Sequence, residues 1–183
     1  DEVAWSKRII AAHAEAEARG EGVVLVEGKL IENLHVANAR RVVALAGRIA
    51  TEFPQWDGFG LAVQSYLTTG LAVVDEVAAM AHRHGLKFMV RLVKGAYWDG
   101  EIKRAQEAGL PGYPVFTHKQ HTDIAYLACA RALIGHADVI YPQFASHNAA
   151  TVAAIAQMAR AANAKFEFQR LHGMGEELYA HVT

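Results

Sequence analysis

Cysteine is nearly absent from this sequence, because Cys129 is the single one in 183 residues. A lone cysteine excludes an internal disulfide framework and a cysteine-only zinc site. Cys129 stands in the apolar run from Ala125 to Ala132, so we expect a small buried core residue. Long apolar runs are lacking as well, since none reaches the roughly 18 residues of a membrane span. The N-terminus has no basic stretch followed by an apolar one, so we expect a protein of the reducing cytoplasm.

Net charge is also small. Lysine and arginine number 18 and aspartate and glutamate 19, which leaves a formal charge of -1. The basic residues are scattered along the chain, so nucleic acid and anionic membrane surfaces are poor candidates for partners. Apolar residues make up 52% of the composition, which is enough for a buried core.

Short apolar runs alternate with helical spacings along the chain. Predicted strands cover 23–26, 58–63, 87–93, 139–144 and 165–169, and predicted helices cover 1–20, 36–52, 71–82, 122–134, 148–162 and 176–181. Apolar strands that alternate with helices are typical of a parallel sheet covered by helices. The expected fold class is α/β, a partial (β/α)₈ TIM-type barrel of about five parallel strands, because the chain is shorter than the roughly 250 residues of a complete barrel.

Polar, aromatic or glycine residues follow four successive predicted strands. Gln64 ends the second strand, and the runs from Lys94 to Asp99, Ser146 to Asn148 and Gln169 to Gly175 follow the next three. In such folds ligands bind beyond the carboxyl ends of the strands, so the site is predicted at this edge.

Arg91 lies within an otherwise apolar strand, where an unpaired guanidinium is costly to bury. We therefore expect it to face a ligand or a carboxylate, and a structural ion pair inside a barrel stays open as the alternative. Lys94 and Gly95 add a second cation and a flexible backbone, where an anion or an electron-rich ring could sit.

Two further pairs of residues after the strands have two interpretations each. Tyr97 and Trp98 offer flat surfaces for stacking, although a packed lid is the commoner role for such a pair. Asn148 could cap the helix that follows it, while His147 could project into the pocket.

Hydroxyl and cationic side chains stand just before the helix predicted at 122–134. Thr117, Lys119 and Thr122, together with the free N–H groups of a helix start, favour phosphate, and a capping box without a ligand explains the pattern equally well. The histidines show no recognised metal spacing, so we expect no bound metal. The glycine-rich dinucleotide turn, the phosphate loop and the serine nucleophile elbow are also missing from the sequence.

Long motifs from about residue 56 onward resemble one family, the proline dehydrogenase domain of the bifunctional proline utilization A flavoproteins. They are GLAVQSY (60–66), MVRLVKGAYWD (89–99), EIKRAQ (101–106), GLPGYPVFT (109–117), YLACA (126–130), IYPQFASHN (140–148) and FEFQRLHGMGE (166–176).

The resemblance implies an FAD-dependent enzyme of proline catabolism that oxidises L-proline to pyrroline-5-carboxylate and passes electrons to a membrane quinone. By matching position, Gln64 would contact the flavin ring and Arg91 would lie near its reactive edge. Gln169 and Leu171 would lie near the ring and the proline site, and Arg91 and Leu171 are the expected catalytic residues. The other residues expected to bind the cofactor are Val93, Lys94, Gly95, Tyr97, Trp98, Thr117, Lys119, Thr122, His147 and Asn148.

The first 52 residues depart from this pattern. Family members carry an acidic motif like Asp-Ala-Glu-Glu at the end of an early strand, whereas this chain has Glu27-Gly28-Lys29. The run 23–41 resembles the C-terminal part of the citrate lyase and malyl-CoA lyase barrel family (HpcH/HpaI-type aldolases). The resemblances imply a segment of lyase-like barrel character at 1–52 and a proline dehydrogenase-like, FAD-binding segment at 53–183.

The family's lysine-bearing strand and the arginine helix that clamps the proline carboxylate have no counterpart in this sequence. We therefore expect a truncated or chimeric domain with impaired activity, and peripheral membrane association for full-length members of the family. A catalytically silent fragment, an oligomerising scaffold and a Mg²⁺-dependent CoA-thioester lyase fragment remain as alternatives. A homo-oligomer would protect the open edges of a partial barrel.

Overall fold

The computed structural model describes residues 24–26, 29–31, 45, 48–49, 51–56 and 58–182. The chain divides into two compact units, one made of 1–56 with 82–86 and the other of 57–81 with 87–183. The helix predicted at 1–20 and most of the helix predicted at 36–52 lie outside the described residues.

A small antiparallel sheet forms in the first unit. β1 (Val24–Val26) pairs with β2 (Lys29–Ile31), with Val24 opposite Ile31. The strand predicted at 23–26 is therefore confirmed over its described residues, 24–26. The prediction that it is the first of five parallel strands is wrong, because β1 and β2 form a sheet of their own. Two residues separate these strands in the sequence, and antiparallel strands, unlike parallel ones, can be joined by so short a connection.

The second unit contains a four-stranded parallel sheet. Its strands lie in the order β3 (Gly60–Gln64), β4 (Phe88–Val93), β5 (Ile140–Ala145) and β6 (Glu167–Gln169). Each strand pairs with the one that follows it in the chain, and a helical segment joins them. This βα repeat is the partial TIM-type barrel architecture that the sequence predicts, with four parallel strands rather than five.

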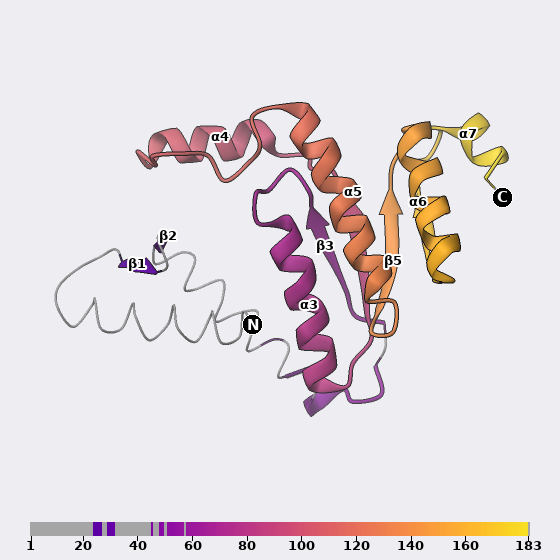
Figure 1. The fold of residues 1–183 in the computed structure, drawn as a ribbon. Helices are drawn as coiled ribbons and strands as arrows, with labels where there is room; N and C mark the ends of the chain where they lie inside the picture. Colours follow the sequence, from indigo (N-terminus) through magenta and orange to yellow (C-terminus); the bar gives the residue numbers. More distant parts are fainter. Residues whose placement is uncertain are drawn as a thin grey trace. The chain divides into compact units, whose positions relative to one another are not determined.

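Helices that connect the strands lie alongside this sheet (Figure 1). They are α3 (Gly70–His84), α5 (Lys119–Gly135) and α6 (Ala149–Ala162), and a short α7 (Glu176–Ala180) follows β6. All four confirm predicted helices, and α5 begins three residues earlier than predicted. Gly85 follows α3 with φ at +61°, in the left-handed region that favours glycine after a helix. Within the described part of the chain, no helix has both the length and the apolarity needed to cross a membrane.

One helix was not predicted. α4 (Trp98–Glu107) occupies the polar stretch between β4 and α5, and Ala105 is its buried residue. Its surface carries the ion pairs Arg104–Glu101 at 2.5 Å and Lys103–Glu107 at 3.7 Å, which join successive turns. α4 is polar on average and has few apolar residues, so no run of apolar positions reveals it in the sequence.

Side chains alternate between the two faces of the parallel sheet. Phe88, Val90 and Leu92 of β4 are each no more than 1% exposed and form the core with Ile140 and Phe144 of β5. α5 contacts both of these strands and also α6, so this face of the sheet is covered by helices. The opposite face is lined by residues that are partly or fully exposed, and it is open within the described part of the chain.

Tyr126 of α5 ties the carboxyl ends of β4 and β5 together. Its hydroxyl lies 3.2 Å from the carbonyl oxygen of Leu92 and 3.0 Å from that of Ala145, and its single proton can serve either acceptor. Burial raises the pKa of Tyr126, which keeps the hydroxyl protonated as a donor. Cys129 lies three residues further along α5 and is fully buried, which confirms its predicted place in the core.

Candidate functional site

A row of four residues crosses the open face of the sheet. In the strand register Arg91 pairs with Ala62 on one side and Gln143 on the other, and Gln143 pairs with Glu167. Side chains at paired positions share a face, because they alternate with period two along each strand. The next row toward the carboxyl ends contains Gln64 paired with Val93, and Ala145 paired with Gln169. Four of the predicted site residues therefore lie on one surface: Gln64, Arg91, Val93 and Gln169.

Arg91 carries an exposed guanidinium on this surface. It forms no hydrogen bond or ion pair with any residue in the described part of the chain. The structural ion pair, which was the alternative role expected for Arg91, is therefore not formed among the described residues. An unpaired cation in the middle of an apolar strand is suited to attract an anion or a developing negative charge.

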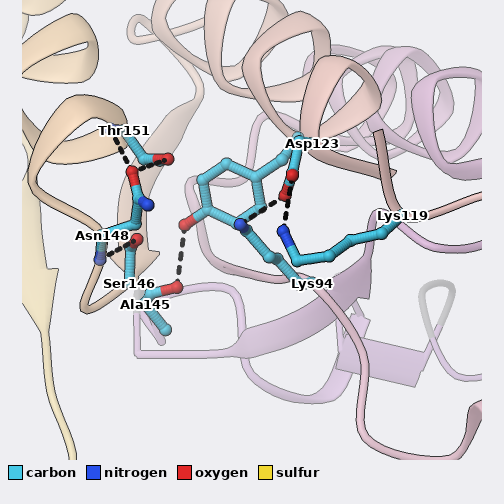
Figure 2. A network of polar contacts seen from close by, with 8 residues as sticks. Lys94, Lys119, Asp123, Ala145, Ser146, Asn148 and Thr151 are labelled. Carbon is cyan, nitrogen blue, oxygen red and sulfur yellow. Dashed lines mark hydrogen bonds and ion pairs between the residues drawn. The ribbon is translucent and has the colours of Figure 1, made fainter. Parts of the chain in front are cut away.

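Two predicted cofactor lysines meet on one carboxylate. Lys94 Nζ lies 2.5 Å from Asp123 Oδ1, and Lys119 Nζ lies 2.6 Å from Asp123 Oδ2 (Figure 2). The hydrogen bond from Lys119, followed by that from Lys94, lowers the pKa of Asp123 below its usual value. The cluster joins the end of β4 to the first turn of α5 and has one more positive charge than negative, so it suits an anionic ligand.

The start of α5 has no side-chain cap. His118 occupies the N-cap position and makes no capping hydrogen bond through its side chain. The capping box, which was the alternative to phosphate binding for this segment, is therefore not formed. Thr117 lies exposed before the helix, and Thr122 is 9% exposed within its first turn.

Gly95 allows two strand-end loops to pack against each other. Its φ of +136° lies in the region that favours glycine, and a Cβ there would lie 2.3 Å from Cδ1 of Tyr66. Backbone N–H groups of Ser65 and Tyr66 donate to the carbonyl oxygens of Val93 at 2.9 Å and Lys94 at 2.8 Å. The loops after β3 and β4 are thus held together with no room for a side chain at position 95.

Tyr97 and Trp98 differ in their surroundings. Tyr97 is 67% exposed at the start of α4, whereas Trp98 donates its Nε1 hydrogen to the carbonyl oxygen of Phe116 at 2.8 Å. Trp98 is therefore fixed against the segment that leads to Thr117, while the ring of Tyr97 is available to a ligand.

His147 and Asn148 each make a contact near the end of β5. The cap formed by Asn148 was predicted, and the hydrogen bond of His147 was not. Asn148 caps α6, because its Oδ1 accepts hydrogen bonds from Thr151 N at 2.9 Å and from Thr151 Oγ1 at 3.1 Å (Figure 2). His147 Nε2 accepts a hydrogen bond from the backbone N–H of Leu171 at 3.1 Å. The loop after β5 is thereby linked to the loop after β6, where the Leu171 side chain is 65% exposed.

Three further polar residues were not predicted as site residues: Gln143 and Glu167 on the open face, and Asp123 on α5 beside Lys94. Gln143 Nε2 donates to Glu167 Oε1 at 2.9 Å, and Gln169 Nε2 donates to the same oxygen at 2.6 Å. In the sequence Glu167 lies between Phe166 and Phe168. This alternation of apolar and polar residues is typical of a half-buried strand, and it could have identified Glu167 as a residue of the open face. Asp123 stands four residues after Lys119, the spacing of a helical ion pair.

An apolar groove of about 370 Å³ is lined by residues of α5, of the start of α3 and of the segments before these two helices. None of the predicted site residues lines it. Its lining consists of Leu67, Thr68, Leu71, Phe116, His121, Ile124, Ala125 and Ala128.

Comparison with known proteins gives consistent results for most of the chain. The family model for proline dehydrogenase matches residues 27–183. The bifunctional protein PutA of Escherichia coli (strain K12) is 52% identical over 134 residues, which are 72% of this chain and 10% of PutA. A solved structure of proline utilization A with proline bound in remote sites superposes with a TM-score of 0.73 and 54% identity, over 79% of this chain and 15% of the other.

A second, shorter similarity exists. The (3S)-malyl-CoA thioesterase of Cereibacter sphaeroides is 49% identical over 49 residues, which are 27% of this chain and 17% of that enzyme. The chain spans about a tenth of the curated PutA relatives that it matches. Since the proline dehydrogenase model covers well over half of the sequence, the chain belongs to the proline dehydrogenase family.

Proposed function

We propose that this chain holds FAD across the open face of its parallel sheet and takes part in the oxidation of L-proline to pyrroline-5-carboxylate. Membership of the proline dehydrogenase family supports the reaction. The observation that carries the proposal is the guanidinium of Arg91, which has no partner among the residues that the structure describes and shares its sheet face with Gln64, Val93 and Gln169.

The residues on this surface fit a flavin ring by their chemistry. The ring has a polar edge with both hydrogen-bond donors and acceptors, and the amides of Gln64 and Gln169 offer both kinds of partner. Val93 offers an apolar contact between the two amides. Arg91 would stabilise negative charge that develops on the ring during reduction, which is a usual contribution of protein to flavin chemistry.

The phosphate end of the cofactor would lie at the start of α5. Lys94 and Lys119 supply two cations there, and the uncapped helix start adds backbone N–H donors. Thr117 and Thr122 would add hydroxyl donors. His147 and Asn148 would contribute from the loop after β5, where Asn148 still has its amide nitrogen to donate. Tyr97, Trp98 and Gly95 would border the cofactor between the two ends.

The reaction turns a carbon–nitrogen single bond of the proline ring into a double bond, as a hydride leaves the ring carbon and a proton leaves the nitrogen. When bound, FAD supplies the acceptor for the hydride that leaves the ring carbon next to nitrogen. Leu171 is exposed at the end of β6, and its apolar side chain would pack against the proline ring and displace water from it. The hydrogen bond from Leu171 N to His147 holds this residue in place.

An FAD titration of the purified chain tests the first half of the proposal. We expect flavin fluorescence to be quenched on binding, and Arg91→Ala to weaken binding while Arg104→Ala, an exposed arginine on α4, does not. A chain with no affinity for FAD would refute the proposal. Anaerobic addition of L-proline to the FAD complex then tests the second half, since bleaching of the flavin band is expected and an unchanged spectrum would limit the chain to cofactor binding.

We also propose that residues 1–52 form a lyase-like segment and 53–183 the FAD-binding segment, and that a quinone is the final electron acceptor. The 49-residue similarity to malyl-CoA thioesterase supports the first division. Limited proteolysis with and without FAD tests it, because FAD is expected to protect peptides from 53–183 alone. The role of the quinone is tested by reducing the bound flavin anaerobically and then adding a soluble quinone, which is expected to reoxidise it.

A further inference from the structure

Glu167 receives two hydrogen bonds on a single oxygen. Gln143 on β5 donates to Glu167 Oε1 at 2.9 Å, and Gln169 on β6 donates to the same atom at 2.6 Å. Glu167 pairs directly with Gln143 across the sheet, and it lies two positions before Gln169 on the same strand face. The carboxylate therefore lies between two carboxamides on the open surface.

This arrangement determines which way both amides point. An ionised carboxylate accepts hydrogen bonds and cannot donate them, so each glutamine must turn its NH₂ group toward Glu167. The second N–H of Gln143 faces Met89 Sδ at 3.9 Å, which uses both of its donors. The carbonyl oxygens of the two amides then point away from Glu167.

The consequence is largest at Gln169. One of its N–H groups is used by Glu167, so a ligand meets its carbonyl oxygen and one remaining N–H. A flavin ring edge presents a ring N–H beside a carbonyl oxygen, which such an acceptor–donor pair matches. A freely rotating glutamine would present either end, and would lose part of its hydrogen-bond energy to the cost of ordering the side chain.

We propose that Glu167 is a positioning residue that fixes the carboxamides of Gln143 and Gln169 in one orientation and so prepares Gln169 to bind the flavin ring. This inference rests on the proposed function. Glu167 forms no ion pair with Arg91 in the described part of the chain, and Gln143 lies between them in the register. Its effect is transmitted through the amides.

The hydrogen bonds are tested first, on the chain without FAD. The side-chain amide signals of Gln143 and Gln169 in ¹⁵N-labelled protein are expected to show slow hydrogen exchange and to shift in Glu167→Ala. Glu177→Ala, which removes an exposed acid on α7, is the control and is expected to leave both signals in place. Signals that do not move in Glu167→Ala would overturn the proposal.

The link to the flavin is tested by a double-mutant cycle. Glu167→Ala is expected to weaken FAD binding about tenfold, the effect of losing one well-oriented hydrogen bond. In a Gln169→Ala background the same change is expected to have no effect, whereas a merely structural role would persist there. ADP, which has no flavin ring, is expected to bind equally to the wild type and to Glu167→Ala.

A near-isosteric variant covers the case in which Glu167→Ala does not fold. Glu167→Gln can donate as well as accept, so the neighbouring amides lose their fixed orientation and FAD affinity is expected to fall by a smaller factor. Wild-type protein without affinity for FAD would refute the proposed function. Wild-type protein that binds FAD, with both Glu167 variants binding it equally well, would refute the role of Glu167 alone.

Discussion

The imidazole of His147 and the backbone of Leu171 form a hydrogen bond of 3.1 Å in which the ring nitrogen Nε2 is the acceptor. An accepting Nε2 carries no proton, so the ring must carry its proton on Nδ1. This contact connects the loop after β5 to the loop after β6 through one side chain.

Replacement of His147 by alanine should therefore loosen the loop after β6. The Leu171 amide loses its acceptor, so its hydrogen exchange is expected to speed up about fivefold. Exchange measured by NMR or mass spectrometry checks this. His172→Ala, in the same loop, serves as the control, and equal exchange rates in the two variants would contradict the prediction.

The Asp123 cluster makes stability depend on pH. Hydrogen bonds from Lys119 and Lys94 lower the pKa of Asp123 in the folded protein below the unfolded value of about 3.9. Its stabilising contribution is therefore present above that value and is lost as the pH falls through the folded pKa. Asp123→Asn should be less stable than wild type by under about 1 kcal/mol at pH 7, since the pair is partly exposed. Urea unfolding of both proteins from pH 7 down to pH 3 should show this difference shrinking, and a constant difference would contradict it.

Gly95→Ala should be strongly destabilising. The new methyl group would overlap the ring of Tyr66, and the backbone would keep a φ of +136°. The sum of overpacking and strain is at least about 3 kcal/mol in the free energy of unfolding. Gly100→Ala on α4 is the matched control, because its Cβ would meet open space. That variant is expected to gain about 0.5 to 1 kcal/mol, and similar urea midpoints for the two variants would refute the distinction.

Arg91→Ala should lower the affinity for FAD while leaving the stability of the fold nearly unchanged. The guanidinium has no partner in the described residues, so its loss should change the free energy of unfolding by no more than about 0.5 kcal/mol. FAD affinity is expected to fall about tenfold or more, because a charged partner of the ring is removed. The reduction potential of bound flavin should also fall, since the reduced ring loses a nearby cation. Matched affinity and potential would show that Arg91 lies away from the ring.

Cys129 should report on unfolding. Burial raises the pKa of its thiol to about 11, and the residue is fully buried on α5. A thiol reagent such as DTNB at pH 8 should therefore react slowly with native protein and rapidly in urea. Fast labelling of native protein, with intact far-UV circular dichroism, would contradict the observed packing.

The strands and helices of the parallel sheet were predictable because each has a strong local signal. β4 and β5 read as short apolar runs, and α6 begins at a capping asparagine, Asn148. α4 lacked such a signal, since it is mostly polar and Ala105 is its buried residue. The pairing of β1 with β2 depends on chain geometry that the four apolar residues at 23–26 do not encode.

For the site, the residues that lie at strand ends were predictable from the sequence. Their contacts with one another were not, because they depend on register and on segments far apart in the sequence. Lys94 and Asp123 are 29 positions apart, so no helical spacing could have paired them. Gln143 and Glu167 are 24 positions apart, and they meet only because β5 and β6 align in one particular register.

Tyr126 supports the ligand surface from behind it. Its hydroxyl lies within hydrogen-bond distance of the carbonyl oxygens of Leu92 and Ala145, which come shortly before Lys94 and His147. The bases of these two loops are thus held by the pairing of β4 with β5 and by a buried group on the helix side of the sheet, which no ligand on the open side can touch. Substitutions in the loops can accordingly change which chemical groups are bound while the distance between the two halves of the surface stays the same.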